Sequence, residues 1–147
     1  MSKAVEIFEV GPRDGLQNEP AFISSEDKIA LTQALAGAGL RRIECASFVS
    51  PKWVPQMADA AQVVEGVTPG AAQLYALAPN NRGLRAALAT PVGGLCVFIA
   101  ATEGFSRANT NISLAGAVER VQDVIATFRA EAPTGVRLRG YISCVTE

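Results

Sequence analysis

The 147-residue sequence predicts an α/β fold built on a parallel sheet. Short apolar runs typical of strands alternate with longer segments whose apolar residues recur at helical spacing. No Asn-Gly turn joins one strand segment to the next, so hairpins are not expected. Residues 94–101 are almost wholly apolar, which is typical of a strand covered on both faces. This alternation implies right-handed crossovers between parallel strands.

The first strand segment covers residues 5–10, and a helix over residues 24–38 follows it. Ser24, with Asp27 three residues later, resembles a capping box that begins a helix. Gly39 is a typical helix stop. The side of this helix that faces the core is expected to hold Ile29, Leu31, Ala34, Leu35 and Ala38.

The second strand segment covers residues 40–48 and the third covers residues 71–78. A loop with two prolines and a helix that ends near Glu65 lie between them. After the third strand, Asn80 or Asn81 can cap the next helix.

The fourth strand segment covers residues 94–101. Residues 105–111 are expected to form a basic loop around Arg107, and Ser113 opens the longest helix. The core stripe of that helix is expected to hold Leu114, Ala117, Val118, Val121, Ile125 and Phe128. A fifth strand covers residues 136–143.

Composition excludes several classes of function. With 13 Lys+Arg against 14 Asp+Glu, the net charge of −1 offers no field for nucleic acid or an anionic membrane. No apolar run is long enough to cross a bilayer, and no targeting segment is recognisable, so we expect a cytoplasmic protein with no membrane partner. The chain has no histidine, which excludes Ser-His and Cys-His nucleophilic machinery.

The three cysteines are scattered and form no C-x-x-C pair. Cys45, Cys96 and Cys144 each lie inside a predicted strand. They are therefore expected to be small buried hydrophobic residues in a reducing compartment.

Polar residues gather where the predicted strands end. In a parallel α/β fold the chemistry lies at the carboxyl ends of the strands, whether the sheet is an open doubly wound one or part of a (β/α)₈ barrel. Both architectures fit the pattern, although a whole barrel takes about 250 residues. The polar residues at these ends are Arg13, Asp14, Gln17, Glu44, Ser47, Asn80, Asn81, Thr102, Glu103, Arg139, Tyr141 and Ser143.

Glu44 is the most informative of these residues. A carboxylate inside a strand covered on both faces is costly unless a cation pairs with it, and Arg13 on the neighbouring strand is the natural partner. An arginine held in this way can present its remaining donors to an oxyanion. Asp14 would then be free to bind Mg²⁺ or Mn²⁺. The alternatives are a plain charged turn at Arg13-Asp14 and a purely structural ion pair at Glu44.

Three motifs resemble the hydroxymethylglutaryl-CoA lyase family. They are GPRDGLQNE at residues 11–19, SFVSPKWVPQM at residues 47–57 and RGYISC at residues 139–144. That family belongs to a superfamily of divalent-metal-dependent (β/α)₈ enzymes, and the similarity extends over essentially the whole chain. The resemblance implies the N-terminal part of a (β/α)₈ TIM barrel, with four βα units plus a fifth strand in one domain, residues 1–147.

The resemblance also implies a reaction and a division of roles. The family cleaves 3-hydroxy-3-methylglutaryl-CoA to acetoacetate and acetyl-CoA in leucine degradation, with Mg²⁺ or Mn²⁺ as cofactor. Asp14 would be a metal ligand, Arg13 would stabilise the thioester enolate, and Glu44 would support the catalytic groups. Arg13, Gln17, Ser47 and Tyr141 would line the pocket of the acyl-CoA substrate. Residues 107–111 would meet the CoA moiety.

The family completes its metal site with two histidines and an asparagine that lie on later strands. Those later strands are not part of this sequence. We therefore expect the chain alone to lack turnover. The alternatives are a non-catalytic truncated relic or assembly partner, and a related acyl-CoA condensing synthase or oxo-acid aldolase. A half-barrel exposes two sheet edges, so a homo-oligomer or association through these edges is expected.

Overall fold

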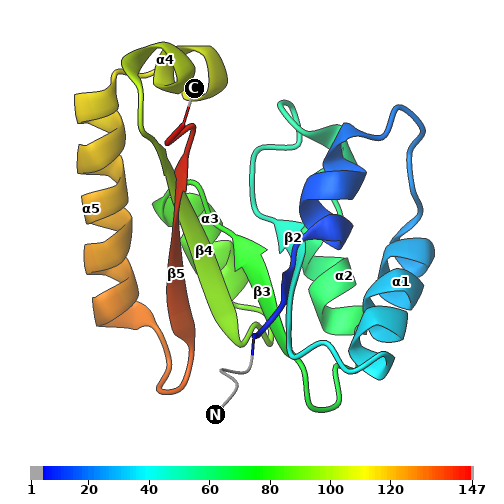
Figure 1. The fold of residues 1–147 in the computed structure, drawn as a ribbon. Coiled ribbons are helices and arrows are strands. Elements are labelled where there is room, and N and C mark those ends of the chain that lie inside the picture. The colour runs from blue at the N-terminus through cyan, green and yellow to red at the C-terminus, as the bar shows by residue number, and fades with distance from the viewer. Residues whose placement is uncertain (1–4, 147) are drawn as a thin grey trace.

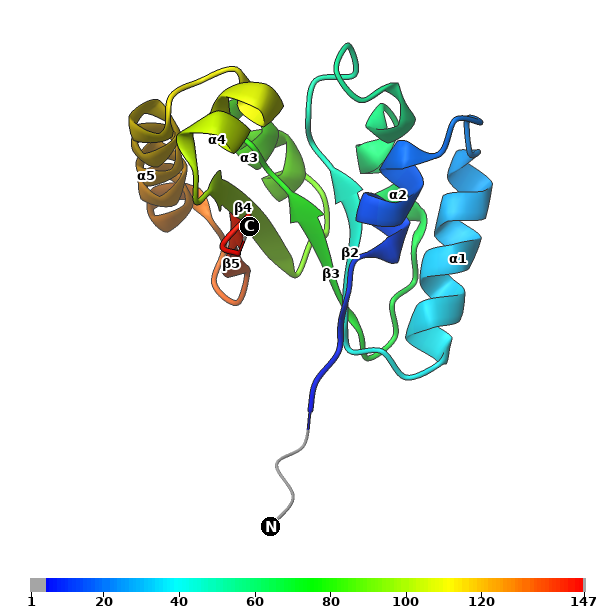
Figure 2. The same cartoon turned by 45° about the horizontal axis from the view of Figure 1, so that its top comes forward.

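The computed structural model describes residues 5–146 and contains one sheet of five parallel strands. The strands lie in the order β1-β2-β3-β4-β5, which is also their order in the chain. The predicted α/β fold with a parallel sheet is therefore confirmed. A doubly wound sheet reverses its strand order at a switch point, and this sheet does not. Figures 1 and 2 show a curled half-barrel with helices on its outer side, as expected for part of a TIM barrel.

The strands are β1 (Phe8–Glu9), β2 (Arg42–Ser47), β3 (Gln73–Leu77), β4 (Gly94–Ala100) and β5 (Arg137–Ser143). The α-helices are α1 (Ser25–Gly37), α2 (Ala60–Gly66), α3 (Asn81–Leu88), α4 (Glu103–Thr110) and α5 (Leu114–Glu131). Three short helical segments complete the set, the π-helix η1 (Gly11–Gly15) and the 3₁₀ helices η2 (Leu16–Asn18) and η3 (Pro55–Met57).

The predicted helix caps are confirmed. The side-chain oxygens of Ser24, Asn80 and Ser113 each accept a hydrogen bond from the backbone N–H three residues later. Each bond satisfies one of the amide groups that the first turn of a helix leaves without a partner. These three local signals therefore set where α1, α3 and α5 begin.

Three predicted segments differ from the structure. Strand β1 is shorter than residues 5–10, because it pairs with β2 alone and Val5 before it is 91 % exposed. Residues 105–111 are not a loop, since Thr102 caps helix α4 there through the N–H of Phe105. The GPRDG motif is a π-helix instead of a simple turn.

The predicted core stripe of α1 is wrong in part. Leu31 is 39 % exposed and Ala34 and Ala38 are also exposed, whereas Lys28 and Thr32 are buried. The helix is rotated in this way because Lys28 pairs with Asp59 near the start of α2. Val118 on α5 is likewise exposed, and the buried residues of that helix are Ala117 and Val124.

The prediction that Cys144 is buried inside a strand is wrong. This cysteine lies just after β5, is exposed and has a φ of 56°. Cys45 and Cys96 are buried as predicted.

The two faces of the sheet carry separate apolar clusters. The main core lies between the sheet and the outer helices and includes Ile43, Leu74, Leu95 and Val124. A smaller cluster contains Tyr75, Leu77 and Cys96, with Phe8, Phe98 and Tyr141 packed against it. Because side chains alternate across a strand, this smaller cluster occupies the inner face of the half-barrel.

Both edges of the sheet carry exposed apolar side chains. Within residues 5–146, β1 pairs only with β2 and β5 pairs only with β4. Ile7 beside β1 is 59 % exposed, and Ile142 and Val145 at the other edge are 66 % and 69 % exposed. Among the residues described, no helix has the length and apolar character needed to span a membrane.

Candidate active site

The π-helix η1 carries Arg13 and Asp14 directly beyond the carboxyl end of β1. The carbonyl oxygen of Val10 accepts hydrogen bonds from the backbone N–H of Arg13 at 3.1 Å and of Asp14 at 2.7 Å. The Glu9 carboxylate accepts the N–H of Gly11 at 2.7 Å, and a Cβ atom at Gly11 would lie only 2.8 Å from that carboxylate. The Glu9 side chain therefore lies directly against the start of the motif.

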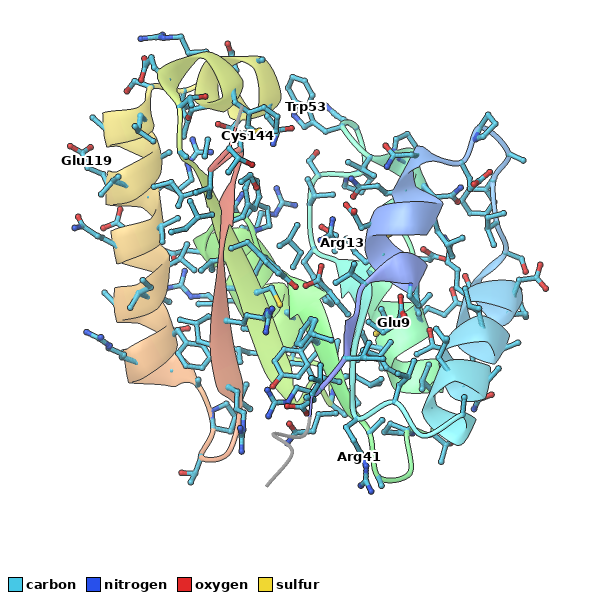
Figure 3. All side chains as sticks on the ribbon, viewed as in Figure 1. Glu9, Arg13, Arg41, Trp53, Glu119 and Cys144 are labelled. Carbon is cyan, nitrogen blue, oxygen red and sulfur yellow. The ribbon has the colours of Figure 1, made fainter. Side chains whose placement is uncertain are left out.

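Glu44 in the middle of β2 is fully buried, and the guanidinium of Arg13 binds it. The Nε–H of Arg13 donates to Oε1 of Glu44, so the ion pair predicted from the sequence is confirmed. The Nη1 atom of Arg13 lies 2.7 Å from Oδ1 of Asp14. Figure 3 shows Arg13 extending from η1 toward the strands. The buried carboxylate holds the arginine at the carboxyl end of the sheet.

Tyr141 on β5 binds the second oxygen of the same carboxylate. Its phenol donates to Oε2 of Glu44 at 2.7 Å, and the Sγ atom of Cys96 lies 3.7 Å from the phenol oxygen. Burial and the hydrogen bond to Glu44 raise the pKa of Tyr141, so the phenol remains a proton donor at neutral pH. Burial likewise raises the pKa of Cys96, which keeps it a thiol and a poor nucleophile.

These contacts assign different chemical capacities to the residues. Both oxygens of Glu44 are engaged, one by Arg13 and one by Tyr141, so Glu44 orients other groups. Arg13 uses Nε and Nη1 for its two carboxylates, which leaves the Nη2 edge of the guanidinium for an oxyanion. The arrangement can therefore stabilise negative charge that develops beside η1.

Gln17 and Ser47 were also predicted to line the pocket. Ser47 ends β2 and is 1 % exposed. Gln17 lies in η2, where it lines a groove of about 360 Å³ between η2 and the segment before η3. The other lining residues are Asn18, Glu19, Pro20, Phe22, Trp53, Val54, Pro55 and Gln56. Within residues 5–146, neither Gln17 nor Ser47 hydrogen-bonds to Arg13 or Glu44 through its side chain.

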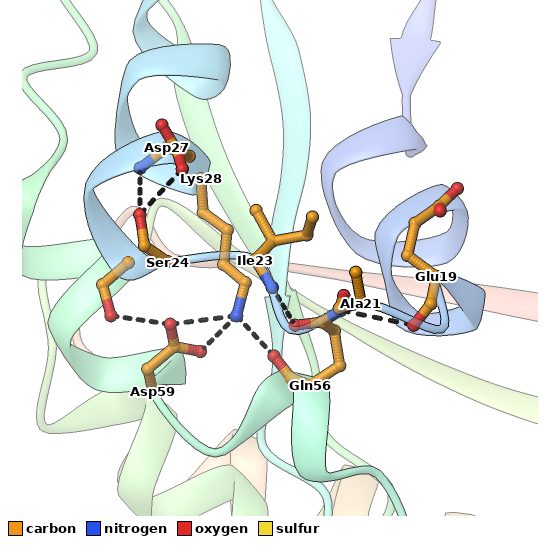
Figure 4. A network of polar contacts seen from close by, with 9 residues as sticks. Glu19, Ala21, Ile23, Ser24, Asp27, Lys28, Gln56 and Asp59 are labelled. Atoms are coloured by element: carbon orange, nitrogen blue, oxygen red, sulfur yellow. Dashed lines mark hydrogen bonds and ion pairs between the residues drawn. The ribbon is translucent and has the colours of Figure 1, made fainter.

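The groove rests on a polar network that the sequence did not reveal (Figure 4). The buried ammonium of Lys28 binds both carboxylate oxygens of Asp59, at 2.8 and 2.9 Å, and the backbone carbonyl of Gln56. The Gln56 amide accepts the N–H of Ile23 at 3.0 Å and donates to the carbonyl of Ala21 at 2.8 Å. These hydrogen bonds join the segment around Ala21 and Ile23 to Gln56 in η3, which are the two sides of the groove. No local pattern indicates these contacts, because the partners lie about 30 residues apart.

Arg107 was predicted to sit in a basic loop suited to CoA. In the structure its Nε lies 2.7 Å from Oε1 of Glu103, one turn earlier in α4. The other oxygen of Glu103 accepts the N–H of Leu114 at 2.7 Å, and this bond is the main reason that the pKa of Glu103 is lowered. Arg107 therefore forms an ion pair with Glu103, and Glu103 links α4 to the start of α5.

The residues described do not form a complete metal site. Within residues 5–146, no group of three or more Cys, Asp or Glu side chains is arranged to hold a metal ion. The Asp14 side chain is 57 % exposed, so it is accessible, but it is a single ligand that also pairs with Arg13. A divalent cation needs roughly six ligands, so Asp14 alone does not make a metal site.

A model of the HMGL-like family matches residues 4–138. The chain is 50 % identical over 146 residues to the 3-hydroxy-3-isohexenylglutaryl-CoA/hydroxymethylglutaryl-CoA lyase of Pseudomonas aeruginosa, covering 99 % of this chain and 48 % of the relative. The solved hydroxymethylglutaryl-CoA lyase of Bacillus subtilis superposes with a TM-score of 0.89 at 40 % identity, over 96 % of this chain and 47 % of that one.

A hydroxymethylglutaryl-CoA lyase from Acinetobacter baumannii, solved in complex with coenzyme A and 3-methylmalate, superposes with a TM-score of 0.85 at 29 % identity. The match covers 93 % of this chain and 44 % of that one. The chain thus spans about half the length of the relatives that it matches.

Proposed function

The chain belongs to the HMGL-like family, and we propose that it supplies the first half of the active site of a hydroxymethylglutaryl-CoA lyase. The observation that carries the proposal is the contact of Arg13, Glu44 and Tyr141, which come from η1, β2 and β5. The reaction splits 3-hydroxy-3-methylglutaryl-CoA into acetoacetate and acetyl-CoA. Leucine degradation is the process that this reaction would serve.

Arg13 is the residue to which we assign the enolate. When the bond between C2 and C3 of the substrate breaks, its electron pair moves onto the thioester carbonyl and forms an enolate, while C3 becomes the ketone of acetoacetate. A guanidinium that Glu44 and Asp14 already orient can donate its free N–H groups to the enolate oxygen without reorganising. Proton transfer to the enolate carbon then gives acetyl-CoA.

Glu44 and Tyr141 are positioning residues in this proposal. Each oxygen of Glu44 already accepts a hydrogen bond, so we do not assign it the removal of the C3 hydroxyl proton. Tyr141 fixes the carboxylate, and the carboxylate in turn fixes Arg13. We assign the base to the part of the barrel that completes this chain.

Asp14 is proposed as one ligand of a divalent cation such as Mg²⁺ or Mn²⁺. Its carboxylate is a hard oxygen donor, and it is accessible beside Arg13. A bound cation would polarise the hydroxyl and carboxylate oxygens of the substrate. Because the described residues offer a single ligand, we propose that the remaining ligands come from the completing half.

The groove beside Gln17 is the basis for proposing a second substrate. The relative from Pseudomonas aeruginosa is named for 3-hydroxy-3-isohexenylglutaryl-CoA as well as for hydroxymethylglutaryl-CoA. The groove of about 360 Å³ is lined in part by Phe22, Trp53 and Val54, which suits an apolar substituent longer than a methyl group. We propose that substrates with such a substituent at C3 are also accepted.

The test is complementation. We expect the chain alone to produce no acetoacetate from hydroxymethylglutaryl-CoA and Mg²⁺, and the chain mixed with the second half of the Pseudomonas aeruginosa relative to produce it. Arg13→Met should lower this turnover by roughly 10²–10³-fold, as for other lost oxyanion donors. Arg129→Met, which removes an exposed guanidinium on α5, is the control.

Other outcomes would change the proposal. Robust turnover by the chain alone would mean that its metal ligands lie within residues 1–147. Consumption of pyruvate or another oxo-acid, with no cleavage of hydroxymethylglutaryl-CoA, would favour a condensing synthase or an aldolase. A complemented pair with no activity toward either substrate class would favour a non-catalytic assembly partner.

A further inference from the structure

Arg139 carries a cation on the inner face of the half-barrel. It lies on β5 in register with the buried Cys96 of β4. Its guanidinium lies 4.1 Å from the ring centre of Phe8 on β1 and 5.2 Å from that of Tyr141. The Phe8 ring in turn packs edge-on against Tyr75, with ring centres 4.9 Å apart. The cation therefore reaches across the inner face and rests on an aromatic surface formed by β1, β3 and β5.

Within residues 5–146, Arg139 has no carboxylate partner. Four of the ten arginines, Arg13, Arg42, Arg85 and Arg107, form ion pairs, and Arg139 is among the six that form none in the part of the chain that the structure describes. Glu44 is the buried carboxylate of the inner face, and both of its oxygens are engaged by Arg13 and Tyr141. Arg139 is exposed, so in this chain water solvates its charge.

A completed barrel would remove that water. The interior of a (β/α)₈ barrel is a packed core of side-chain layers, and a charge buried there without a partner is costly. Contact with aromatic rings offsets only part of the lost hydration. We propose that the polypeptide which completes this barrel presents a carboxylate to Arg139, and that this ion pair selects the partner. The inference rests on the proposed function only in assuming that a barrel is completed.

The polypeptide that we propose to complete the barrel is a segment of about three strands with an acidic residue that faces the barrel interior. Eight strands close a barrel of this type, and five are present here. The chain also spans about half of its relatives' length, so a segment of the remaining length is the natural complement. A second copy of this chain fits less well, because it would bring a second Arg139 and a Glu44 that is already engaged, and ten strands in total.

The experiment measures association of this chain with the second half of the Pseudomonas aeruginosa relative. Trp53 is the single tryptophan of the chain and is 80 % exposed, and a fluorophore attached to the exposed Cys144 gives a second signal. We expect Arg139→Met to weaken association at least tenfold, and Arg139→Lys to weaken it less because the charge remains. Arg129→Met on the exposed side of α5 is the matched control. Urea midpoints of the three variants alone should stay close to that of the parent, because neither Arg139 nor Arg129 forms an ion pair within residues 5–146 of the free chain and an exposed cation–aromatic contact contributes little to stability.

A charge cycle then locates the partner residue. Each inward-facing Asp or Glu of the completing half is changed to its amide. The change at the true partner should weaken binding to the parent chain but should weaken binding to Arg139→Met very little, because the ion pair is already lost. The inference is overturned if the dissociation constant of Arg139→Met lies within threefold of that of the parent. It is likewise overturned if the losses of affinity caused by Arg139→Met and by every amide variant are additive. It is also overturned if the chain forms a stable dimer that the second half does not displace.

Activity distinguishes the two proposals. Arg139-dependent association without acetoacetate would contradict the lyase proposal and support this one. Full acetoacetate production by a pair that contains Arg139→Met, at unchanged affinity, would support the lyase and contradict the ion pair.

Discussion

Tyr141 on β5 donates a hydrogen bond of 2.7 Å to Glu44 on β2, across 97 residues of chain. The strands that carry the two residues are not neighbours in the sheet, because β3 and β4 lie between them. The contact is possible because the sheet curls and brings both side chains to its inner face (Figure 2). Glu44 is thus bound by Arg13, which follows the edge strand β1, and by Tyr141 on the opposite edge strand β5.

This contact predicts a specific dependence of stability on pH. Burial and the hydrogen bond to Glu44 raise the pKa of Tyr141 in the folded chain above the value near 10 of an unfolded chain. The folded state therefore keeps the phenol proton more strongly. The stabilisation is fully present below about pH 10 and is lost as the pH rises above that value.

Urea unfolding between pH 8 and 11.5 tests this dependence. The free energy of unfolding should fall more steeply above about pH 10 for the parent than for Tyr141→Phe. Parallel curves for the parent and Tyr141→Phe would contradict the prediction.

Lys28 should be important for stability although it contributes no group to the proposed chemistry. It is 1 % exposed, and its ammonium binds Asp59. Lys28→Met leaves a largely buried carboxylate without its cation, which typically costs about 3–5 kcal/mol of unfolding free energy. Urea denaturation measures this loss, and Lys52→Met at an exposed site is the control.

The pair can also be tested by a double-mutant cycle. Asp59→Asn should cost less in the Lys28→Met background than in the parent, because the ion pair is already lost. Equal costs in the two backgrounds would show that Lys28 and Asp59 do not interact.

Gly94 at the start of β4 leaves room for the ring of Tyr75. A Cβ atom at Gly94 would lie 2.2 Å from that ring, and Tyr75 is only 2 % exposed. Gly94→Ala should therefore destabilise the chain by about 1–3 kcal/mol through overpacking. Gly140→Ala on β5 is the matched control, because nothing lies within 4 Å of its added Cβ atom. Thermal or urea midpoints that are equal for the two variants would argue against this packing.

The three thiols should differ in reactivity. Cys144 is exposed, whereas Cys45 and Cys96 are buried, and burial raises the pKa of Cys45 to about 12. An aromatic disulfide reagent at pH 8 should label Cys144 rapidly in the native chain and label the other two only in denaturant. Cys144→Ser should abolish the rapid phase, and a rapid phase that persists in this variant would refute the assignment.

Local signals in the sequence predicted much of the fold. The caps at Ser24, Asn80 and Ser113 act within three residues, and each was found by reading the sequence. The Arg13–Glu44 pair was predictable because a carboxylate inside a buried strand requires a cation, and the neighbouring strand offered one. Physical requirements of this kind can be read without knowing the rest of the fold.

Contacts between distant segments could not be read in this way. The rotation of α1 that buries Lys28 depends on Asp59, which lies 31 residues later. Tyr141 was predicted to line the pocket, but its hydrogen bond to Glu44 depends on how strongly the sheet curls. The catalytic, substrate-binding and metal-binding roles assigned to the site residues all stay predictions until a substrate or a cation is bound.

The strand order has a consequence for how the chain folds. Each strand of the sheet pairs with the strand that immediately precedes it in the chain, so no strand must be inserted between two that are already paired. The paired residues of neighbouring strands lie 19 to 43 positions apart, so each step closes only the segment between two consecutive strands and not a longer loop. We therefore expect the sheet to grow in the direction of synthesis on the ribosome, with Glu44 enclosed only when β5 has been made.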